Sequence, residues 1–410
     1  MFLLSEKRKK TVLQRLFFFL PHDTRKIKEN QHSKKPVWIH ALSLGEALSA
    51  APLVMALRQR IRDRKIFFSV STMTGEDIAK KRIADHVDGI FFFPYDFFLT
   101  VKQKIRKIDP ALFIMVETDI WPNFLFELQR KKIPAIWVNA RLSEKSFNGY
   151  RQFSSFICSM FATFSKICTQ SDIDTNRFFD LGTQKNRLVQ TGNMKFDQPA
   201  VSISDIDIDN MKKSLRISTS QKIVIAGSTH KGEEDLLCQA FFRLKKQTPD
   251  LVMIVVPRDP ARSRKVVQIF ESSGFTPTLY SQIKNQNKVP DIIIIDVIGL
   301  LKKLYALSDV AFTGGSLVPS GGHNPLEPAL FAKPVIFGPY MTDFARIAEM
   351  LVEKRGAVQV DDADSLYQTI AKLLHDEKKA VAAGKRAFEV FQANKGAVKK
   401  VVDVIESCLQ

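Results

Sequence analysis

Two series of short apolar segments, one in each half of the chain, constrain the fold most strongly. The segments are continuous, rich in β-branched and aromatic residues, and separated by helix-length amphipathic stretches such as 46–60 and 233–246. This pattern is typical of parallel strands buried on both faces, and it predicts an α/β fold with a doubly wound sheet in each half. We expect strands at 37–43, 65–72, 89–94, 111–118, 135–141 and 166–170, then at 222–229, 251–259, 291–297, 310–316, 334–338 and 357–360.

A segment rich in Gly, Pro, Ser and Asp, residues 191–210, separates the two series and is typical of a linker. The chain of 410 residues is long enough for two cores. We therefore expect a basic N-terminal segment (1–36) and two Rossmann-like domains (37–196 and 197–410) facing each other across a cleft. Ligands of such domains bind at the carboxyl ends of the strands.

Charge limits the class of partner. Lys and Arg number 61 against 43 Asp and Glu, a formal net charge of +18, which attracts polyanions such as nucleic acid, anionic lipid or phosphorylated substrates. No apolar run approaches the roughly 20 residues that span a bilayer. The first 20 residues mix basic and aromatic side chains. They fit a helix on an anionic membrane surface and, equally, a first helix packed on the protein body.

The four cysteines, Cys158, Cys168, Cys238 and Cys408, are widely spaced and form no CxxC pair. This spacing argues against a zinc site or a disulfide framework.

Polar residues follow several of the predicted strands in the first half. Glu46 opens a helix after the first strand, where a carboxylate either caps the helix or acts as a general base; spacing alone favours the cap. Glu117 stands at the end of the fourth strand and is less easily explained as a cap. Asn139 and Arg141 end the next strand, so the sequence predicts a site along this sheet edge.

In the second half, Ser228 and His230 lie between a strand and a helix, in a segment suited to binding phosphate or carboxylate or, alternatively, to capping the helix. Arg258 ends the next strand and is able to grip an anion or to form a surface ion pair. The most specific segment is FTGGSLVPSGGHNPLEP, where the glycines, Gly315 among them, let the backbone approach a ligand closely and Ser316 follows. We expect Asn324 and Pro325 to start a helix and Glu327 to accept hydrogen bonds from a ribose diol.

Seven motifs in this order resemble the 3-deoxy-D-manno-octulosonate (Kdo) transferases: HALSLGE, ETDIWPN, NARLSEKSFNGY, GNMKFD, GSTHKGEE, VPRDP and GGSLVPSGGHNPLEP. The resemblance runs from about Val37 to near the C-terminus. It implies a GT-B fold and transfer, with inversion, of Kdo from CMP-Kdo onto the lipid A precursor at the cytoplasmic face of the bacterial inner membrane. No cofactor, metal or nucleic acid is implied.

The resemblance also implies roles for individual residues. Glu46 would be the proton acceptor, reversing the preference from spacing alone, and Glu117 and Lys195 would stabilise the transition state. The CMP pocket would be lined by Pro257, Arg258, Ile298, Gly299, Leu300, Asn324, Pro325, Leu326 and Glu327. Candidate substrate contacts are Ser228, His230, Gly315 and Ser316.

Three features qualify this interpretation. Leu300 stands where family members usually have a glutamate, which leaves another GT-B enzyme with a different nucleotide sugar as the alternative. The acidic string 205–209 resembles a cation-binding DxD but lies in the predicted linker, so we expect Asp209 to cap the following helix. The aromatic stretch 91–98 is expected to be mostly core, with lipid contact as the alternative.

Overall fold

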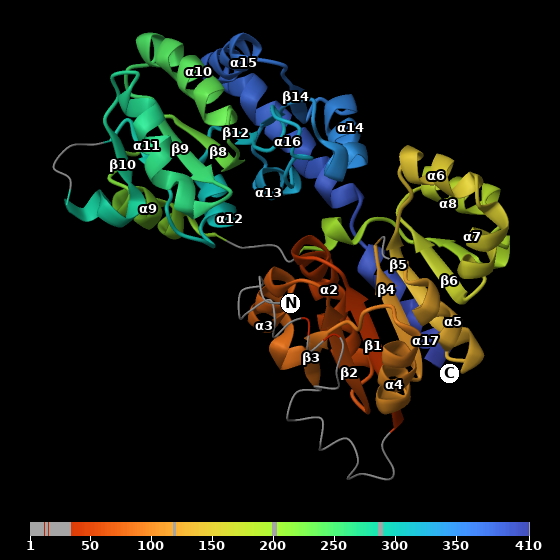
Figure 1. The fold of residues 1–410 in the computed structure, drawn as a ribbon. Coiled ribbons are helices and arrows are strands. Elements are labelled where there is room, and N and C mark those ends of the chain that lie inside the picture. The colour runs from red at the N-terminus through yellow and green to blue at the C-terminus, as the bar shows by residue number, and fades with distance from the viewer. Residues whose placement is uncertain are drawn as a thin grey trace. The chain divides into compact units, whose positions relative to one another are not determined.

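The protein folds as two compact units, 1–199 together with 394–410, and 200–393 (Figure 1). The computed structural model describes Val12, Arg15 and residues 34–117, 120–198, 203–285 and 290–409. The predicted N-terminal segment therefore lies almost entirely outside the described residues. Within it, the Arg15 guanidinium donates to the Phe93 carbonyl oxygen at 3.0 Å and lies 4.0 Å from the centre of the Tyr95 ring.

The first unit contains a seven-stranded sheet in the order β3-β2-β1-β4-β5-β6-β7, with every pair parallel. Its strands are β1 (Lys34–Ala41), β2 (Arg64–Val70), β3 (Gly89–Phe92), β4 (Leu112–Val116), β5 (Ala135–Ala140), β6 (Phe164–Thr169) and β7 (Leu188–Gln190). Its helices are α2 (Leu44–Arg60), α3 (Met73–Ile83), α4 (Phe98–Ile108), α5 (Pro122–Arg130), α6 (Glu144–Arg151), α7 (Ser154–Phe161), α8 (Asp172–Asp180) and α17 (Ala397–Leu409), with short 3₁₀ turns at Ala84–His86, Lys185–Arg187 and Met194–Asp197 (η4).

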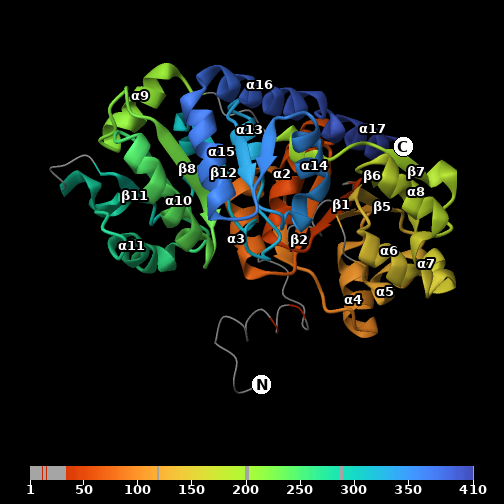
Figure 2. The same ribbon diagram turned by 90° about the horizontal axis from the view of Figure 1, so that it is seen from above.

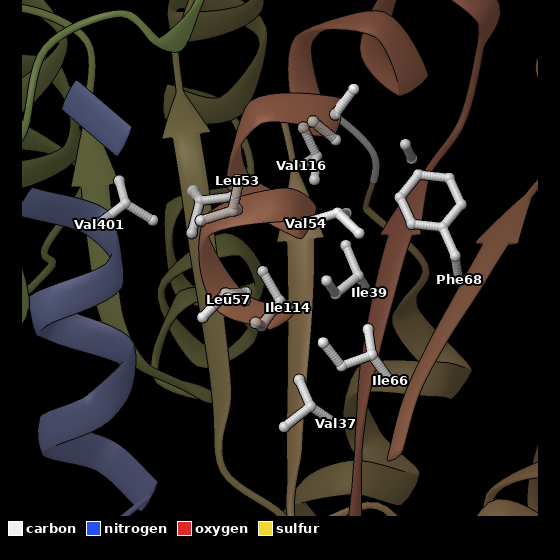
Figure 3. Packing of buried hydrophobic residues seen from close by; sticks show 14 of the residues in the cluster. Val37, Ile39, Leu53, Val54, Leu57, Ile66, Phe68, Ile114, Val116 and Val401 are labelled. Carbon is white, nitrogen blue, oxygen red and sulfur yellow. The ribbon is translucent and has the colours of Figure 1, made fainter. Parts of the chain in front are cut away.

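Successive side chains of the central strands point to opposite faces of this sheet, and both faces are buried. Val37 and Ile39 pack against α2 and α17, through residues such as Leu53 and Val401 (Figure 3). Trp38, between them in sequence, packs with aromatic side chains on the other face, where α4, α5, α7 and α8 lie. Double-sided burial explains why the strands are continuous apolar runs.

The second unit repeats the alternation of strands and helices (Figure 2). Its sheet has the order β10-β11-β9-β8-β12-β13-β14, with parallel pairing throughout. Its strands are β8 (Ile223–Thr229), β9 (Val252–Pro257), β10 (Pro277–Leu279), β11 (Ile292–Ile294), β12 (Val310–Thr313), β13 (Val335–Phe337) and β14 (Ala357–Gln359). Its helices are α9 (Asp205–Ser214), α10 (Glu233–Gln247), α11 (Ser263–Glu271), α12 (Leu301–Leu304), α13 (Leu326–Ala329), α14 (Ala345–Glu353), α15 (Ala363–His375) and α16 (Glu377–Ala393), with 3₁₀ turns at Pro260–Arg262, Tyr280–Asn285, Tyr305–Leu307 and Thr342–Phe344.

The predicted α/β class and all twelve predicted strands are confirmed, and the structure adds β7 and β10. Both additional strands have three residues and lie at one edge of their sheet, so they carry little apolar pattern. The C-terminal boundary also differs from the expected one. The second domain was expected to run to 410, but α17 packs on α2 and belongs to the first unit, because its Val401 and Ile405 complete the core beneath the first sheet.

Two local expectations are corrected. Asp209 lies inside α9 and does not cap it: Ser204 caps this helix, and its hydroxyl and the Asp207 carboxylate accept each other's backbone N–H groups in a capping box. The aromatic stretch 91–98 is core only at its start. Phe97 and Phe98 are 61% and 45% exposed where α4 begins.

Among the described residues, no helix is long and apolar enough to cross a membrane.

Candidate functional site

Three residues at the carboxyl ends of strands have a strained backbone conformation. In the described part of the chain, eight non-glycine residues have a positive φ. Five of them end or follow a helix, where a left-handed residue is common: Asp109, Lys132, Arg216, Ala332 and Arg355. The other three, Glu117, Asn139 and Ser228, lie at carboxyl ends of strands. Such a conformation costs about 1–3 kcal/mol and persists only where neighbouring contacts enforce it, so these positions indicate a functional edge.

Glu117 follows β4 and is almost completely buried. Its Oε1 accepts a hydrogen bond from Asn139 Nδ2 at 3.2 Å and lies 3.4 Å from the Lys195 ammonium nitrogen. The Trp137 indole N–H donates to the Glu117 carbonyl oxygen, which fixes the strained backbone from β5. The predicted residues Glu117 and Lys195 are therefore brought together as a largely buried ion pair.

Asn139 joins three elements at this edge. Its Nδ2 also lies 3.3 Å from the Ser49 hydroxyl of α2, and its Oδ1 accepts the backbone N–H of Met194 at 3.0 Å. Its own carbonyl oxygen accepts a hydrogen bond from Gln170 at 2.8 Å. A buried amide with all these partners is rigid, and it sets the distance between Glu117 and the segment that carries Lys195.

Lys195 lies in η4, which is held at both ends. On one side the Asn193 side chain accepts the Lys195 backbone N–H at 2.9 Å and donates to Gln170 at 2.8 Å. On the other side the Asp197 carboxylate accepts the backbone N–H groups of Gly396 and Val398, both at 2.6 Å, at the start of α17. The position of Lys195 therefore depends on the last helix of the chain.

Glu46 lies in the first turn of α2 and is also buried. Its Oε2 accepts the backbone N–H of Leu42 at 2.6 Å, and its own N–H donates to Ser43 Oγ at 3.4 Å, so the capping role considered from the sequence is present. Glu46 lies in the helix that follows β1, and Glu117 lies directly after β4. β1 and β4 are neighbours at the point where the strand order reverses, which is where ligands bind in such folds.

In the second unit, a buried carboxylate fills the loop after β12. Glu233, the first residue of α10, accepts four backbone N–H groups: Gly315 and His230 on Oε2 at 2.7 and 2.9 Å, and Ser316 and Leu317 on Oε1, both at 2.9 Å. Successive N–H groups of this kind form an anion-binding nest. Here the anion is supplied by the protein itself.

This arrangement changes the interpretation of Gly315 and Ser316. Their N–H groups are engaged by Glu233, and Ser316 is fully buried, with its hydroxyl donating to the Thr313 carbonyl oxygen at 2.5 Å and accepting the Gly338 N–H at 2.8 Å. Burial and these internal partners give Ser316 a structural role in the loop, and the substrate contact expected of it stays a prediction. Ser228 is half-buried at the strained end of β8.

His230 and His323 come together above this loop. Their Nε2 atoms lie 2.8 Å apart, and the two ring planes are inclined by 20° with their centroids 5.1 Å apart, so the rings meet edge to edge. A Cβ on Gly315, whose φ is +68°, would come within 3.1–3.4 Å of both rings. Burial lowers the pKa of His323 to about 4, assisted by the positive charge of Arg258 and by His230.

The predicted CMP-binding residues occupy the ends of β9 and the starts of α12 and α13. Pro257 is buried at the end of β9, and Arg258 is exposed directly after it, with no ion pair to any described residue. Ile298 is 84% exposed and Gly299 has a φ of +99°, while Leu300 packs partly against the core.

Asn324 Oδ1 accepts the N–H of Leu326, the first residue of α13, at 3.1 Å, and Pro325 directly precedes the helix, close to the expected start. Burial raises the pKa of the Glu327 carboxyl group, opposed by the charges of Lys302 and Arg258. The Glu327 carboxylate, in the first turn of α13, makes no hydrogen bond to the side chain of another described residue.

Several residues that hold the predicted site residues in place were not identified from the sequence. Glu233 and Glu234 both lie in the motif GSTHKGEE, but neither was given a role of its own; Glu234 binds Arg262 through both oxygens at 2.8 and 3.1 Å. Ser49 and Gln170 were missed as well. Two adjacent glutamates at the start of an amphipathic helix were the available signal in the first case. No group of three His, Cys, Asp or Glu side chains suited to a metal ion occurs among the residues described.

Comparison with known proteins defines the class first. The fold is similar to the UDP-GlcNAc 2-epimerase from Neisseria meningitidis, with a TM-score of 0.65 at 13% identity over 91% of this chain and 100% of that one. It is also similar to a glycosyltransferase from Rickettsia africae, with a TM-score of 0.62 at 13% identity over 92% and 100% of the two chains. The chain is thus an α/β protein of the GT-B glycosyltransferase fold.

Sequence comparison identifies the family. Residues 11–198 match the family model of the 3-deoxy-D-manno-octulosonic-acid transferases (kdotransferases). A transferase of this name from Haemophilus influenzae is 34% identical over 375 residues, 91% of this chain and 87% of the relative. One from Rickettsia felis is 28% identical over 93% and 81% of the two chains. The chain belongs to the Kdo transferase family, and it is a glycosyltransferase.

Proposed function

We propose that this Kdo transferase transfers Kdo from CMP-Kdo onto a lipid A precursor with inversion at the anomeric carbon. The observation that carries the proposal is the buried Glu117–Lys195 pair at the edge of the first sheet, at the strand-order reversal where Glu46 opens α2. We assign the acceptor to the first unit and the CMP-sugar to the second.

Glu46 is the general base in this mechanism. An acceptor hydroxyl attacks the anomeric carbon of Kdo as the bond from that carbon to the CMP phosphate oxygen breaks, and the hydroxyl proton passes to the Glu46 carboxylate. The hydrogen bond from Leu42 to Glu46 Oε2 orients the carboxylate within the first turn of α2. Glu117 holds the Lys195 ammonium group, which offsets negative charge that develops in the transition state.

The second unit binds the nucleotide in this proposal. Arg258 supplies a guanidinium group for the phosphate, and the Glu327 carboxylate accepts hydrogen bonds from the ribose hydroxyl groups. Ile298, Gly299 and Leu300, together with Asn324, Pro325 and Leu326, form the walls around the base and ribose. Leu300 cannot accept a hydrogen bond through its side chain, so contacts there come from the backbone.

The acceptor is an anionic lipid, and two properties support contact with a membrane surface. The net charge of +18 attracts anionic head groups. Phe97, Phe98 and Leu99 expose apolar side chains together at the start of α4. We place the enzyme peripherally at the cytoplasmic face of the bacterial inner membrane. The double substitution of Phe97 and Phe98 by Ser should weaken acceptor binding while the protein stays folded. The control, Phe242→Ser at an exposed position of the second unit, should leave acceptor binding unchanged. Equal acceptor affinity in the two variants would contradict the lipid contact.

The first experiment measures transfer from freshly generated CMP-Kdo to tetraacylated lipid A precursor by mass spectrometry of the product. Wild type should transfer, and Glu46→Ala should lose about 10²–10⁴-fold in rate while remaining folded, as expected for loss of a general base. Glu144→Ala, at the exposed start of α6, is the matched control and should remain active.

Donor choice is tested by competition. CMP should inhibit transfer and UDP should not. Inhibition by UDP alone, with no transfer from CMP-Kdo, would favour a different nucleotide sugar, and Leu300 would be the first residue to examine.

A further inference from the structure

The histidine pair of the second unit has a geometry that the proposed transfer mechanism does not use. The distance of 2.8 Å between His230 Nε2 and His323 Nε2 requires one hydrogen between them. In the neutral pair, the donor ring carries this hydrogen on Nε2 and has a bare Nδ1, whereas the acceptor ring carries its hydrogen on Nδ1. One further proton on the bare Nδ1 gives a singly charged pair with the Nε2 hydrogen bond intact.

The Glu233 carboxylate holds the backbone beside the histidine pair. Glu233 accepts the His230 backbone N–H and the N–H groups of the loop at Gly315, so one carboxylate fixes both the backbone at His230 and the loop beside the rings. Gly315 leaves room for the rings, which a side chain would push away.

The surroundings favour an anion beside the pair. Arg258 directly follows the neighbouring strand β9, is exposed, and has no ion pair to any residue that the structure describes; its positive charge contributes to the lowered pKa of His323. Lys231 is exposed in the same loop as His230. The acidic groups nearby include Glu233, whose oxygens are occupied by four N–H groups, Glu327 on α13, and Asp259, which is exposed next to Arg258 and accepts the Ala261 N–H.

The position of the histidine pair at the strand-order reversal of the second sheet indicates which anion binds there. β8 and β12 are neighbours where the strand order of the second sheet reverses, and His230 follows β8 directly. Phosphate groups of nucleotides bind at such reversals in open α/β sheets. We propose that the His230–His323 pair binds the phosphate group of the nucleotide donor and that this binding draws one proton from solvent onto the pair.

This inference rests on the proposed use of a nucleotide donor, and its consequence is a linkage between phosphate binding and proton uptake. In the free protein His323 is neutral near pH 6 and 7, since its pKa is about 4. A bound phosphate favours the charged form and raises that pKa. Between the two pKa values the complex holds more protons than the free protein, so affinity rises as the pH falls, by up to tenfold per pH unit.

The test uses CMP as the probe in calorimetric titrations of the full chain. Titrations at pH 6 and 8 in buffers of different ionisation enthalpy give the number of protons taken up. The phosphate of CMP itself titrates near pH 6, but this contribution is shared by all variants. Wild type should take up more protons at pH 6 than His323→Asn or His230→Asn, by up to one proton. Cytidine, which lacks the phosphate, should show no such difference.

His375→Asn, at the exposed end of α15, is the matched control and should behave like wild type. Thermal unfolding of each variant verifies that it is folded, and two separate histidine variants ensure that one folding failure does not decide the result. CMP binding with equal proton uptake in wild type and both variants overturns this inference and leaves the proposed donor intact. No CMP binding by wild type overturns both.

Discussion

At the scale of single residues, the buried carboxylates are the side chains whose replacement has the clearest expected effect. Glu117, Glu233 and Glu234 are all buried, and each has a specific set of partners. Burying a carboxylate without partners is costly, so each of these side chains depends on the groups around it. The consequences are measurable one residue at a time.

Replacing Glu233 by Ala should lower the free energy of unfolding by about 3–5 kcal/mol, because several buried N–H groups lose their acceptor at about 1–3 kcal/mol each. The measurement is urea unfolding at pH 7. Asp235→Ala in the same turn of α10 is exposed and should change the stability by less than about 1 kcal/mol. Similar losses in both variants would show that the internal anion is not what holds the loop.

Replacing Lys104 should have the opposite effect on the free energy of unfolding. It is buried in α4 with its ammonium nitrogen 4.4 Å from the centre of the Phe91 ring, and burial lowers its pKa to about 8. The unfolded chain, with a pKa near 10.5, therefore binds more protons than the folded protein between about pH 8 and 10.5, so stability rises with pH in that window.

Lys104→Met should consequently stabilise the protein by about 1–3 kcal/mol at pH 7 and remove this part of the pH dependence. Urea unfolding at pH 7, 8 and 9.5 measures both effects, with the exposed Lys102→Met as control. A variant that is less stable than wild type at pH 7 would contradict the prediction.

At the scale of elements, the first-unit site is assembled from segments far apart in the sequence. Helix α2 contributes Glu46 and Ser49, β5 contributes Asn139, and η4 contributes Lys195. The link from η4 to α17 through Asp197 is the longest in sequence, and it makes the C-terminal helix part of the site's support.

Asp197→Asn should weaken this link, because an amide loses the charge that favours a helix N-terminus and keeps only one acceptor oxygen. We expect a loss of about 1–2 kcal/mol in stability, faster hydrogen exchange at the start of α17 and slower transfer through displacement of Lys195. Asp403→Asn, exposed on α17, controls for the change of charge. Unchanged exchange at Gly396 and Val398 would refute the link.

At the scale of the whole molecule, the two units differ in how the chain builds them. Residues 200–393 form the second unit from one continuous segment, whereas the first unit needs residues 394–410 in addition to 1–199. Val398, Val401, Val402 and Ile405 of α17 are buried in the core of the first unit.

A chain of residues 200–393 should therefore unfold cooperatively by itself, and a chain of residues 1–199 should not. Joining 394–410 to residue 199 through a short Gly-Ser linker should restore cooperative unfolding, because Asp197 and Gly396 are hydrogen-bonded in the folded unit. Urea titrations followed by circular dichroism measure all three. Cooperative unfolding of 1–199 alone would show that α17 is dispensable for this core.

Local pattern predicted the elements well and their partners poorly. The central strands were recognisable because both faces of each sheet are buried. The strands β7 and β10 have three residues each and lie at a sheet edge, so they show little apolar pattern. Glu46, Glu117 and Lys195 were identified through the motifs they occupy, and the Glu117–Lys195 contact places two of them together. The contact of Glu233 with the N–H groups of Gly315 and Ser316 was not predicted, because Glu233 lies in a different motif.

The sequence by itself determined the fold class, the series of strands and the family, because burial on both faces of a parallel sheet and a chain of ordered motifs are properties of local sequence. Tertiary structure alone decided three things: the return of α17 to the first unit, the occupation of the glycine loop by Glu233, and the pairing of His230 with His323. Each depends on contacts between segments distant in sequence, and the energy of such contacts comes from burial and hydrogen-bond geometry that exist only once the chain has folded.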